Sequence, residues 1–271
     1  MPKAAVGVIG GSGLYEFLDE VESVTLDTPY GPHSPGLTTG TLTGRMVAFI
    51  PRHGSKHELP PHLINYRANI WALRRLGVSQ ILAPCAVGSL QTHLQPGSFV
   101  VPDQIVDRTG MRKNTFITSG VAHVSFADPY CPTGRGVVLK AANECGIEAA
   151  DGAAMVVIDG PRFSTRAESR WYSDSGWDLV NMTGQPEAVL AREMAACYTA
   201  IALVTDMDAG LAREESVTQF DALATFSENI DRLRELLQRS LSALPDEPDC
   251  SCLGALDGMA VTHVPDSLRT P

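Results

Sequence analysis

Two acidic side chains close the apolar stretch IALVTDMDAGLAREES, residues 201–216. Asp206 and Asp208 stand two positions apart after a predicted buried strand, so both side chains should point to the same side. Two neighbouring carboxyl groups raise the pKa of one of them, which favours a proton donor that works near neutral pH. A metal-binding pair is the competing interpretation, although the neighbouring sequence offers no further ligands.

A basic cluster occupies the stretch IPRHGSKHELPPH, residues 50–62, of a chain that is otherwise acidic. It contains Arg52, His53, Lys56, His57 and His62. The cluster directly follows a predicted strand, at the edge where α/β sheets bind ligands. Because arginine can bind a phosphate through two hydrogen bonds and histidine adds a donor, the cluster favours an anion site over a solvated loop.

Glycines dominate the stretch VIGGSGLYEF, residues 8–17. It lacks the third glycine of a dinucleotide-binding fingerprint and the Gly-Lys-Ser/Thr of a Walker loop. The backbone N–H groups around Ser12, with its hydroxyl, could still hold one phosphate-sized anion. A tight turn that binds nothing is the equally weighted alternative.

Three further stretches are weaker signals. ILAPCAVGSL, residues 81–90, ends in small residues that allow a ligand to approach the backbone. IDGPRFSTRAES, residues 158–169, places Phe163 on a loop, where it could stack on a flat base or pack in the core. Thr183 precedes a predicted helix, which suits an anion site or an ordinary capping hydroxyl.

The elements that must position these side chains alternate along the chain. Predicted strands are Ala5–Ile9, Met46–Ile50, Ser79–Ala83, Ser98–Val106, Ala154–Ile158, Asp178–Asn181 and Ala200–Thr205. Predicted helices are Pro61–Leu76, Arg135–Glu144, Pro186–Tyr198 and Phe220–Leu244, with Gly77 and Gly146 as C-caps. The alternation predicts a single α/β domain, residues 1–245, with a mixed central β-sheet flanked by helices. A shift to Pro, Asp and Gly predicts a C-terminal arm or tail over 246–271.

Composition excludes several classes of protein. The chain has 271 residues, 44% of them hydrophobic and 19% charged, which is enough apolar material for a sizeable core. A net charge of −10 disfavours nucleic acids and anionic membranes as partners. The sequence has no apolar run of about 18 residues and no signal peptide, so we expect a cytoplasmic protein.

The cysteines do not have metal-binding C-x₂-C spacing, so no metal site is expected. Most stand apart or in apolar surroundings, where they are interpreted as small buried hydrophobic residues: Cys85, Cys131, Cys145, Cys197 and Cys250. Cys250-Ser251-Cys252 forms a C-x-C pair in the predicted tail. Reduced thiols are expected there, with a strained disulfide or a redox function as the alternative.

Together these stretches resemble the trimeric purine nucleoside phosphorylase family, and within it the branch that acts on 5'-methylthioadenosine. The matching pieces are GVIGGSGL, DTPYG, PRHG, NYRANIWAL, GSLQTHLQPGSFVVPDQIVDRT, DPYCP, GPRFSTRAES, VNMTGQPEAVLARE and VTDMDAG. The resemblance implies a nucleoside phosphorylase fold and phosphorolysis of 5'-methylthioadenosine to adenine and 5-methylthioribose 1-phosphate. It also implies a homotrimer, with a hexamer as the alternative.

The resemblance also implies roles for individual residues. Phosphate would lie against Ser12, Arg52, His53, the Ala86 backbone and Thr183, with His57 nearby. The purine would lie against Phe163, Asp206 and Asp208, and the ribose near Met182. His123 would reach the 5' end of a neighbouring subunit's pocket. Asp206 would protonate purine N7, and inorganic phosphate would be a co-substrate without a metal or organic cofactor.

Two departures from the family pattern leave the substrate open. Cys85 stands where many relatives have Thr, so a weak thiol donor replaces a hydroxyl near the phosphate. Gln219 stands where the methylthio branch has Val, so the slot for the 5' group could accept a hydroxyl instead. A phosphorylase for adenosine or 6-oxopurine nucleosides is therefore an alternative, as are a hydrolase that uses water and a non-catalytic nucleotide-binding module.

Overall fold

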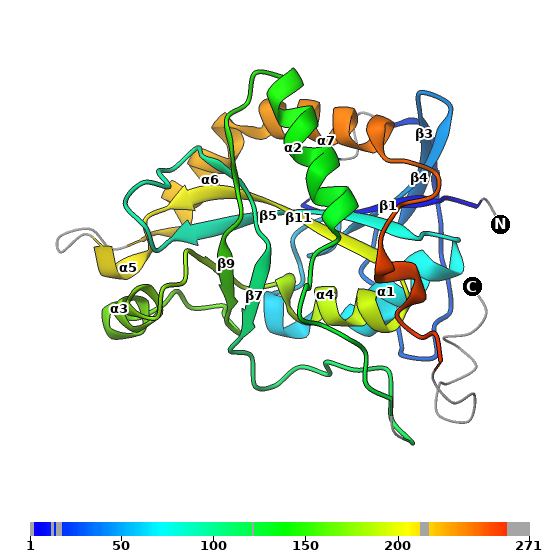
Figure 1. Ribbon diagram of the computed structural model, residues 1–271, viewed down its shortest axis with the longest axis horizontal. Coiled ribbons are helices and arrows are strands. Elements are labelled where there is room, and N and C mark those ends of the chain that lie inside the picture. The colour runs from blue at the N-terminus through cyan, green and yellow to red at the C-terminus, as the bar shows by residue number, and fades with distance from the viewer. Residues whose placement is uncertain (1–2, 12–13, 15–17, 121, 212–216, 259–271) are drawn as a thin grey trace.

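The computed structural model describes residues 3–11, 14, 18–120, 122–211 and 217–258. Strands in these residues form one mixed sheet in the order β2-β3-β4-β1-β5-β10-β9-β7, and β11, β6 and β8 branch from β5 (Figure 1). The strands are β1 Val6–Gly10, β2 Asp19–Ser23, β3 Thr38–Leu42, β4 Arg45–Pro51, β5 Gln80–Ser89, β6 Phe99–Val101, β7 Gln104–Asp107, β8 Ala149–Asp151, β9 Ala154–Val157, β10 Leu179–Asn181 and β11 Cys197–Asp206. The predicted mixed α/β fold is confirmed.

The strand β5 changes neighbours along its length. Its first residues pair in parallel with β1, from Val6 opposite Gln80 to Val8 opposite Leu82. Its last residues pair with antiparallel β10, where Val180 lies opposite Gly88. On its other side, β11 follows it from Gln80 to Gly88. Between Leu82 and Gly88 one edge of β5 therefore has no paired strand among the described residues, and this opening positions the candidate site.

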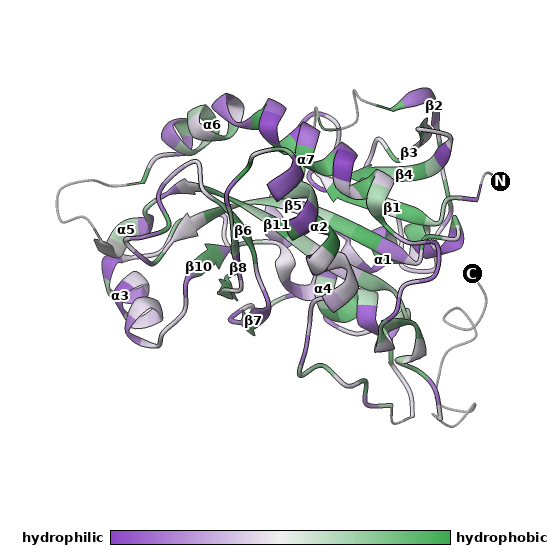
Figure 2. Cartoon of the chain, turned by 45° about the horizontal axis from the view of Figure 1, so that its top comes forward, coloured by the Kyte–Doolittle hydropathy of each residue, from purple (hydrophilic) through white to green (hydrophobic). Residues whose placement is uncertain are grey.

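Helices cover both faces of the sheet (Figure 1). Val6 and Val8 pack in one apolar cluster with Leu236 of α7, whereas Ile9 of the same strand packs in another with Ile70 of α1. This alternation is the two-residue period of a strand that is buried on both faces. Figure 2 shows the hydrophobic residues along β1 and β5 and hydrophilic residues on the outer sides of α6 and α7. The helices are α1 Tyr66–Arg75, α2 Pro132–Glu144, α3 Arg166–Asp174, α4 Gly184–Glu193, α5 Asp208–Leu211, α6 Gln219–Glu228 and α7 Ile230–Ala243.

Several helix boundaries differ from the predictions. The predicted helix Pro61–Leu76 starts as a short 3₁₀ turn, Pro61–Leu63, and α1 begins only after the capping side chain of Asn65. The predicted helix Pro186–Tyr198 corresponds to α4, which ends at Glu193. Its predicted extension to Tyr198 is wrong, because Ala195 adopts a left-handed φ of 49° and the chain then enters β11. The predicted single helix Phe220–Leu244 is two helices that meet at Asn229. Gly77 and Gly146 have positive φ values and follow helices, as predicted.

Strand prediction fails where apolar runs are short or broken. The predicted strand Ser98–Val106 is two strands, β6 and β7, which pair with different neighbours on either side of Pro102. Because proline has no N–H to donate, it interrupts the ladder there. Strands β2, β3 and β8 and helices α3 and α5 were not predicted. A capping box formed by Thr165 and Glu168 starts α3 and was a readable signal.

The described part of the predicted C-terminal arm, residues 246–258, packs against the domain. Cys252 is buried, and Leu256 lies against the main core. The division of the chain at residue 245 stays a prediction. None of the helices in the described ranges has the length and hydropathy that a bilayer span requires.

Candidate active site

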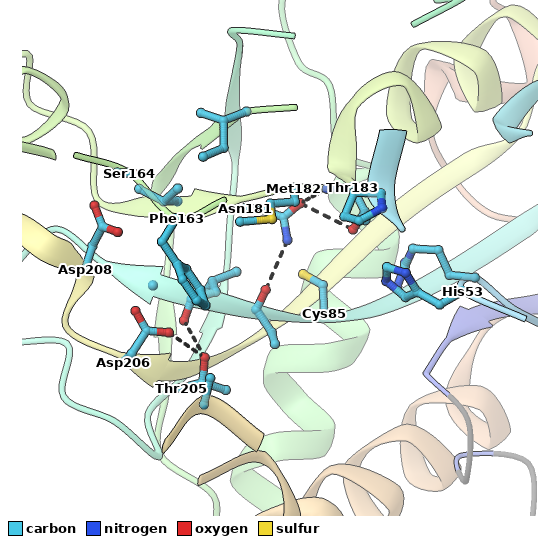
Figure 3. A pocket seen from close by; sticks show the side chains of 18 residues that line it. His53, Cys85, Phe163, Ser164, Asn181, Met182, Thr183, Thr205, Asp206 and Asp208 are labelled. Carbon is cyan, nitrogen blue, oxygen red and sulfur yellow. Dashed lines mark hydrogen bonds between the residues drawn. The ribbon is translucent and has the colours of Figure 1, made fainter. Parts of the chain in front are cut away.

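A cavity opens beside the unpaired edge of β5 (Figure 3). Strands β5, β10 and β11, the loop before α3 and the residues after β4 and β10 contribute its walls. Its lining includes most of the predicted site residues: Arg52, His53, Ala86, Phe163, Met182, Thr183, Asp206 and Asp208. Stretches that are more than 150 residues apart in the sequence, such as Arg52 and Asp206, thus border one space.

One end of the cavity carries the two carboxyl groups (Figure 3). Asp206 is the last residue of β11, and its Oδ2 accepts a hydrogen bond from the Thr205 hydroxyl at 2.9 Å. Burial raises the pKa of Asp206 to about 6, and the charge of Asp208 adds to the rise. The carboxyl group can therefore change its protonation state near neutral pH.

Asp208 is placed differently from the prediction. It is not a strand residue two positions along β11 but the first residue of α5. It nevertheless borders the same cavity as Asp206. Burial raises the pKa of Asp208, and a backbone hydrogen bond from Ala209 offsets part of that rise. Among the described residues, Oδ1 of Asp206 and Oδ2 of Asp208 have no hydrogen-bond partner, which leaves one acceptor on each for a ligand.

Gly88 makes room for the Asp206 carboxyl group. The pairing of β11 with β5 shifts register between Val204 and Asp206, and Asp206 comes to lie opposite Gly88. A methyl group at Gly88 would lie 2.9 Å from Oδ1 of Asp206. Gly88 lies in the stretch of small residues that was predicted to let a ligand approach. In the structure its lack of a side chain leaves room for Asp206 of the neighbouring strand.

Phe163 lies on the cavity wall and not in the core. It is half-buried and belongs to none of the core clusters formed by the described residues. Its ring stands between the carboxyl end and Met182 in Figure 3. The alternative interpretation of Phe163 as a core residue is therefore wrong, and an exposed ring face is available for stacking on a flat group.

Asn181 organises the middle of the cavity, and the sequence analysis did not single it out. Its side-chain Nδ2 donates to the carbonyl oxygen of Ala86 at 3.1 Å, and its Oδ1 accepts from the backbone N–H groups of Thr183 and Gly184. It thereby ties β5 to the start of α4. The readable signal was its place as the polar residue that ends a predicted strand.

Thr183 borders the end of the cavity opposite the carboxyl groups (Figure 3). It is the N-cap residue of α4, but its hydroxyl makes no capping hydrogen bond. The alternative interpretation as a capping hydroxyl is therefore wrong. The hydroxyl makes a long contact of 3.5 Å with Oδ1 of Asn181 and can turn towards a ligand.

Arg52 borders the same end, but protein groups surround most of its guanidinium. Nε and Nη2 pair with the two carboxylate oxygens of Glu187, and Nη1 and Nη2 donate to the carbonyl oxygens of Pro84 and Ile9. Burial opposes its charge, but Glu187 more than offsets this and raises the pKa of Arg52. Arg52 is therefore a permanent, anchored cation between β1, β4 and β5.

His53 lies next to this cation. Its Nδ1 lies 2.9 Å from the carbonyl oxygen of Leu59. Because a carbonyl oxygen only accepts, Nδ1 carries the proton and Nε2 of the neutral ring is an acceptor. Burial and the charge of Arg52 lower the pKa of His53 to about 4, so the ring is neutral at pH 7. Burial also raises the pKa of the neighbouring Cys85 thiol to about 12, which keeps it protonated.

Three predicted site residues within the described ranges do not line this cavity. A further predicted residue, Ser12, lies outside the described residues. His57 is exposed, with its ring stacked on that of His53 at 5.9 Å between centroids. His123 and Gln219 are also exposed, although Ala222, one helical turn after Gln219, borders the cavity. Cys85 and Gly88, which the sequence analysis discussed near the ligand, also line the cavity. Lining residues that it did not propose are Pro61, Val87, Ile158, Ser164, Val180, Asn181, Thr205 and Ala222.

A second group of reactive side chains lies away from this cavity. The sulfur atoms of Cys131, Cys197, Cys250 and Cys252 all lie within 4.8 Å of one another. The burial predicted for Cys131 and Cys197 is confirmed, but the prediction that they and Cys250 stand apart from one another is wrong. Sequence spacing could not show the group, because its members come from three distant parts of the chain.

Comparison with known proteins identifies the family of this chain. Residues 5–244 match the Phosphorylase superfamily, and the chain belongs to that family. It is 54% identical to a protein named purine nucleoside phosphorylase from Streptomyces coelicolor, over 95% of this chain and 96% of the relative. It is also 54% identical to an S-methyl-5'-thioadenosine phosphorylase from Mycolicibacterium smegmatis, over 92% and 95% of the two chains.

A solved structure supports the same grouping. The methylthioadenosine phosphorylase of Schistosoma mansoni in complex with adenine superposes with a TM-score of 0.88 at 37% identity. The match covers 97% of this chain and 100% of the other. The two chains therefore share one fold along nearly their whole length.

Proposed function

We propose that the chain uses inorganic phosphate to cleave 5'-methylthioadenosine into adenine and 5-methylthioribose 1-phosphate. The observation that carries this proposal is that the two ends of the cavity carry different kinds of side chain. Asp206, Asp208 and Phe163 lie at one end, and His53, Thr183 and Arg52 lie at the other, as Figure 3 shows for the labelled residues. The names of the M. smegmatis and S. mansoni relatives support the same substrate.

The carboxyl end suits the purine. Phe163 offers a ring face for the base, and Asp206 can donate its proton to N7 as the bond between C1' and N9 breaks. The electrons of that bond pass to the purine, and the proton from Asp206 neutralises them. The carboxylate acceptors that lack partners, on Asp206 and Asp208, can receive the N–H groups of a 6-amino purine.

The opposite end suits the phosphate. Arg52 supplies a buried positive charge, and the Thr183 hydroxyl supplies a donor. Neutral His53 presents Nε2 as an acceptor, so it can accept the hydrogen bond of the P–OH group of a hydrogen phosphate dianion. This orientation turns an unprotonated phosphate oxygen towards C1', where the new C–O bond forms. The bound dianion also stabilises the cationic character that develops on the sugar.

A purine nucleoside phosphorylase that prefers adenosine or a 6-oxopurine nucleoside is the second candidate. The name of the S. coelicolor relative favours it. So does Gln219, a polar residue on the helix that also brings Ala222 to the cavity. The two candidates share the same chemistry and differ in the 5' group and the base.

One panel of assays separates these proposals. Methylthioadenosine, adenosine and inosine are each incubated with the enzyme, with and without phosphate, and kcat/KM is measured. We expect methylthioadenosine to be cleaved most efficiently and only with phosphate. A higher kcat/KM for adenosine or inosine would transfer the assignment to the second candidate. Turnover that persists after phosphate removal would indicate a hydrolase, and no turnover of any nucleoside would indicate a binding module.

We further propose that the protein works as a homotrimer. The helix α6, which borders the cavity through Ala222, exposes Phe220 and Leu223 by 84% and 52%. Large exposed apolar side chains beside a cavity support an interface there, with His123 completing a neighbouring site. Native mass spectrometry tests the stoichiometry: a monomer or dimer would overturn the proposal, and a hexamer would extend it.

We also propose that catalysis needs neither a metal ion nor an organic cofactor. The phosphate supplies the nucleophile and Asp206 supplies the proton, so the chemistry is complete without either. A chelator added during the assay should leave the initial rate unchanged.

We assign the reaction to the cytoplasm and to purine and methionine salvage. Cell fractionation and accumulation of methylthioadenosine in a deletion strain test these two assignments.

A further inference from the structure

Four cysteines from three parts of the fold meet at one point. Cys131 is the N-cap residue of α2, Cys197 is the first residue of β11, and Cys250 and Cys252 lie in the segment after α7. Cys131, Cys197 and Cys252 are buried, and Cys250 is half-buried. None of the four borders the cavity described above. The group is therefore a separate feature that the proposed function does not use.

The distances within the group suit a shared ion better than pairs of disulfides. The sulfur of Cys250 lies 3.4 Å from that of Cys197 and 3.7 Å from that of Cys131, and every pair of sulfurs lies within 4.8 Å. In a tetrahedral site with Zn–S bonds of about 2.3 Å, the sulfurs stand about 3.8 Å apart. Disulfides would instead bring two sulfurs to about 2 Å in each of two separate pairs. Here the Cys250 sulfur lies at nearly the same distance from the sulfurs of Cys197 and Cys131 and is not paired with one of them.

The surroundings of the sulfurs suit thiolates. The backbone N–H of Gly134, in the first turn of α2, donates to the Cys131 sulfur at 3.4 Å. The guanidinium of Arg192 lies 3.8 Å from the Cys252 sulfur. Both groups offset negative charge, as the outer hydrogen-bonding groups of thiolate metal sites do. A zinc ion held by four thiolates leaves two net negative charges, which these donors partly neutralise.

We propose that Cys131, Cys197, Cys250 and Cys252 bind one structural zinc ion with tetrahedral geometry. Four sulfur ligands fill the coordination sphere and leave no position for a substrate, so the site is structural and not catalytic. Each thiol gives up its proton when the metal binds. Half of the ligands lie beyond residue 244, where the family match ends. The ion would therefore attach the C-terminal segment to the starts of α2 and β11.

The neighbouring hydrogen bonds fit this attachment. The Thr133 hydroxyl donates to the carbonyl oxygen of Asp249 at 2.8 Å, and the Gln80 side chain donates to that of Pro245 at 2.7 Å. These bonds hold the same segment on α2 and on the start of β5, where Gln80 lies opposite Cys197 of β11. Because these hydrogen bonds already hold the cysteines of this segment close to the other two, little further ordering is needed when the metal binds, which favours binding.

Metal analysis of the purified full chain tests the proposal. The protein is produced with added zinc, purified without chelator, and analysed by plasma mass spectrometry and by intact-mass measurement. We expect about one zinc per chain. The double variant Cys250→Ser/Cys252→Ser should contain at least about tenfold less zinc per chain. The control variant Cys145→Ser, which changes a cysteine outside the group, should keep the wild-type zinc content. Cobalt added to the metal-free protein should give the intense visible absorption of a tetrahedral thiolate site.

Two results would overturn the proposal. One is a chain without zinc whose intact mass lacks the hydrogens of four thiols, which would identify two disulfides. The other is a chain with four free thiols that binds neither zinc nor cobalt. If the double variant does not fold, the zinc content of the wild type and of the single variant Cys250→Ser still tests the proposal. Cys250 is the least buried of the four cysteines, so its substitution disturbs the fold least. Because the readout is metal content, the result is independent of which nucleoside the enzyme cleaves.

Discussion

Arg52 and Glu187 form a buried ion pair at the end of the cavity that His53 and Thr183 border, although 135 residues separate them in the sequence. Arg52 is 3% exposed and Glu187 is 1% exposed. Tyr198 also donates to Glu187 at 2.8 Å, so both carboxylate oxygens have buried partners. The pair joins the turn after β4 to α4 and holds the backbone that presents His53.

The substitution Glu187→Ala should destabilise the protein strongly. Removing one partner leaves the Arg52 charge buried without compensation, which costs about 3–5 kcal/mol. Thermal unfolding at a fixed protein concentration measures the loss. The control is Glu144→Ala, which removes the partner of the more exposed Arg239 and should cost about 1 kcal/mol or less. Equal losses in the two variants would contradict the structural role of the pair.

The substitution Asp206→Asn should lower kcat by about 10²–10⁴, because an amide cannot deliver a proton to the base. In the wild type, kcat should fall as the pH rises above the pKa of this carboxyl group, and the variant should lack that fall. Asp174→Asn, at an exposed position at the end of α3, is the control. Wild-type turnover by Asp206→Asn would remove Asp206 from the mechanism.

The same substitution should stabilise the protein at alkaline pH. The pKa of Asp206 rises from 3.8 to about 6 on folding, so at pH above about 6 the folded state holds a buried charge that opposes folding. Below about pH 3 the carboxyl group is protonated in both states and has no effect. The melting temperature of Asp206→Asn should therefore exceed that of the wild type at about pH 8 but not at about pH 3. A variant that melts lower at about pH 8 would show that burial does not penalise the charge.

The substitution His53→Ala should raise the KM for phosphate by about 10- to 100-fold, the effect of losing one hydrogen bond to a charged group. The KM for the nucleoside should change much less. Because the pKa of His53 is about 4, the phosphate KM should show no titration of this ring near pH 6 to 7. The exposed His93, changed to Ala, is the control. An unchanged phosphate KM in His53→Ala would place the anion elsewhere.

The substitution Gly88→Ala should lower kcat by at least about tenfold without preventing folding. The new methyl group would lie 2.9 Å from Oδ1 of Asp206 and displace that carboxyl group. Gly136→Ala is the control, since a methyl group there meets no atom within 4 Å and should stabilise α2. If Gly88→Ala retains full activity, the position of Asp206 tolerates more movement than we infer.

The sequence predicts the parts of the fold that local patterns encode. Buried β-branched runs revealed β1, β4 and β9, and Gly77 and Gly146 marked helix ends because local backbone sterics decide them. Tyr198 was assigned to a helix because its apolar neighbours have no distinctive period. Only tertiary pairing with β5 makes that segment a strand.

The site was predictable to the same extent. Residues at the ends of predicted strands, such as Asp206 and His53, line the cavity because the edge of an α/β sheet gathers them. The partner of Arg52 was not predictable, because nothing near Arg52 in the sequence points to Glu187. The cysteine group was missed for the same reason, since spacing rules apply to ligands that are close in sequence.

The continuous strand β5 also determines how long a ligand can be. Cys85 lies beside Arg52 and His53, and Gly88 lies beside Asp206. A strand rises about 3.3 Å per residue, so these three steps span roughly 10 Å. One continuous segment of backbone therefore fixes the distance between the two ends of the cavity. In the proposed mechanism, changes in α6 alter the preferred 5' group, while this length, and with it the proposed alignment of phosphate and base, stays constant.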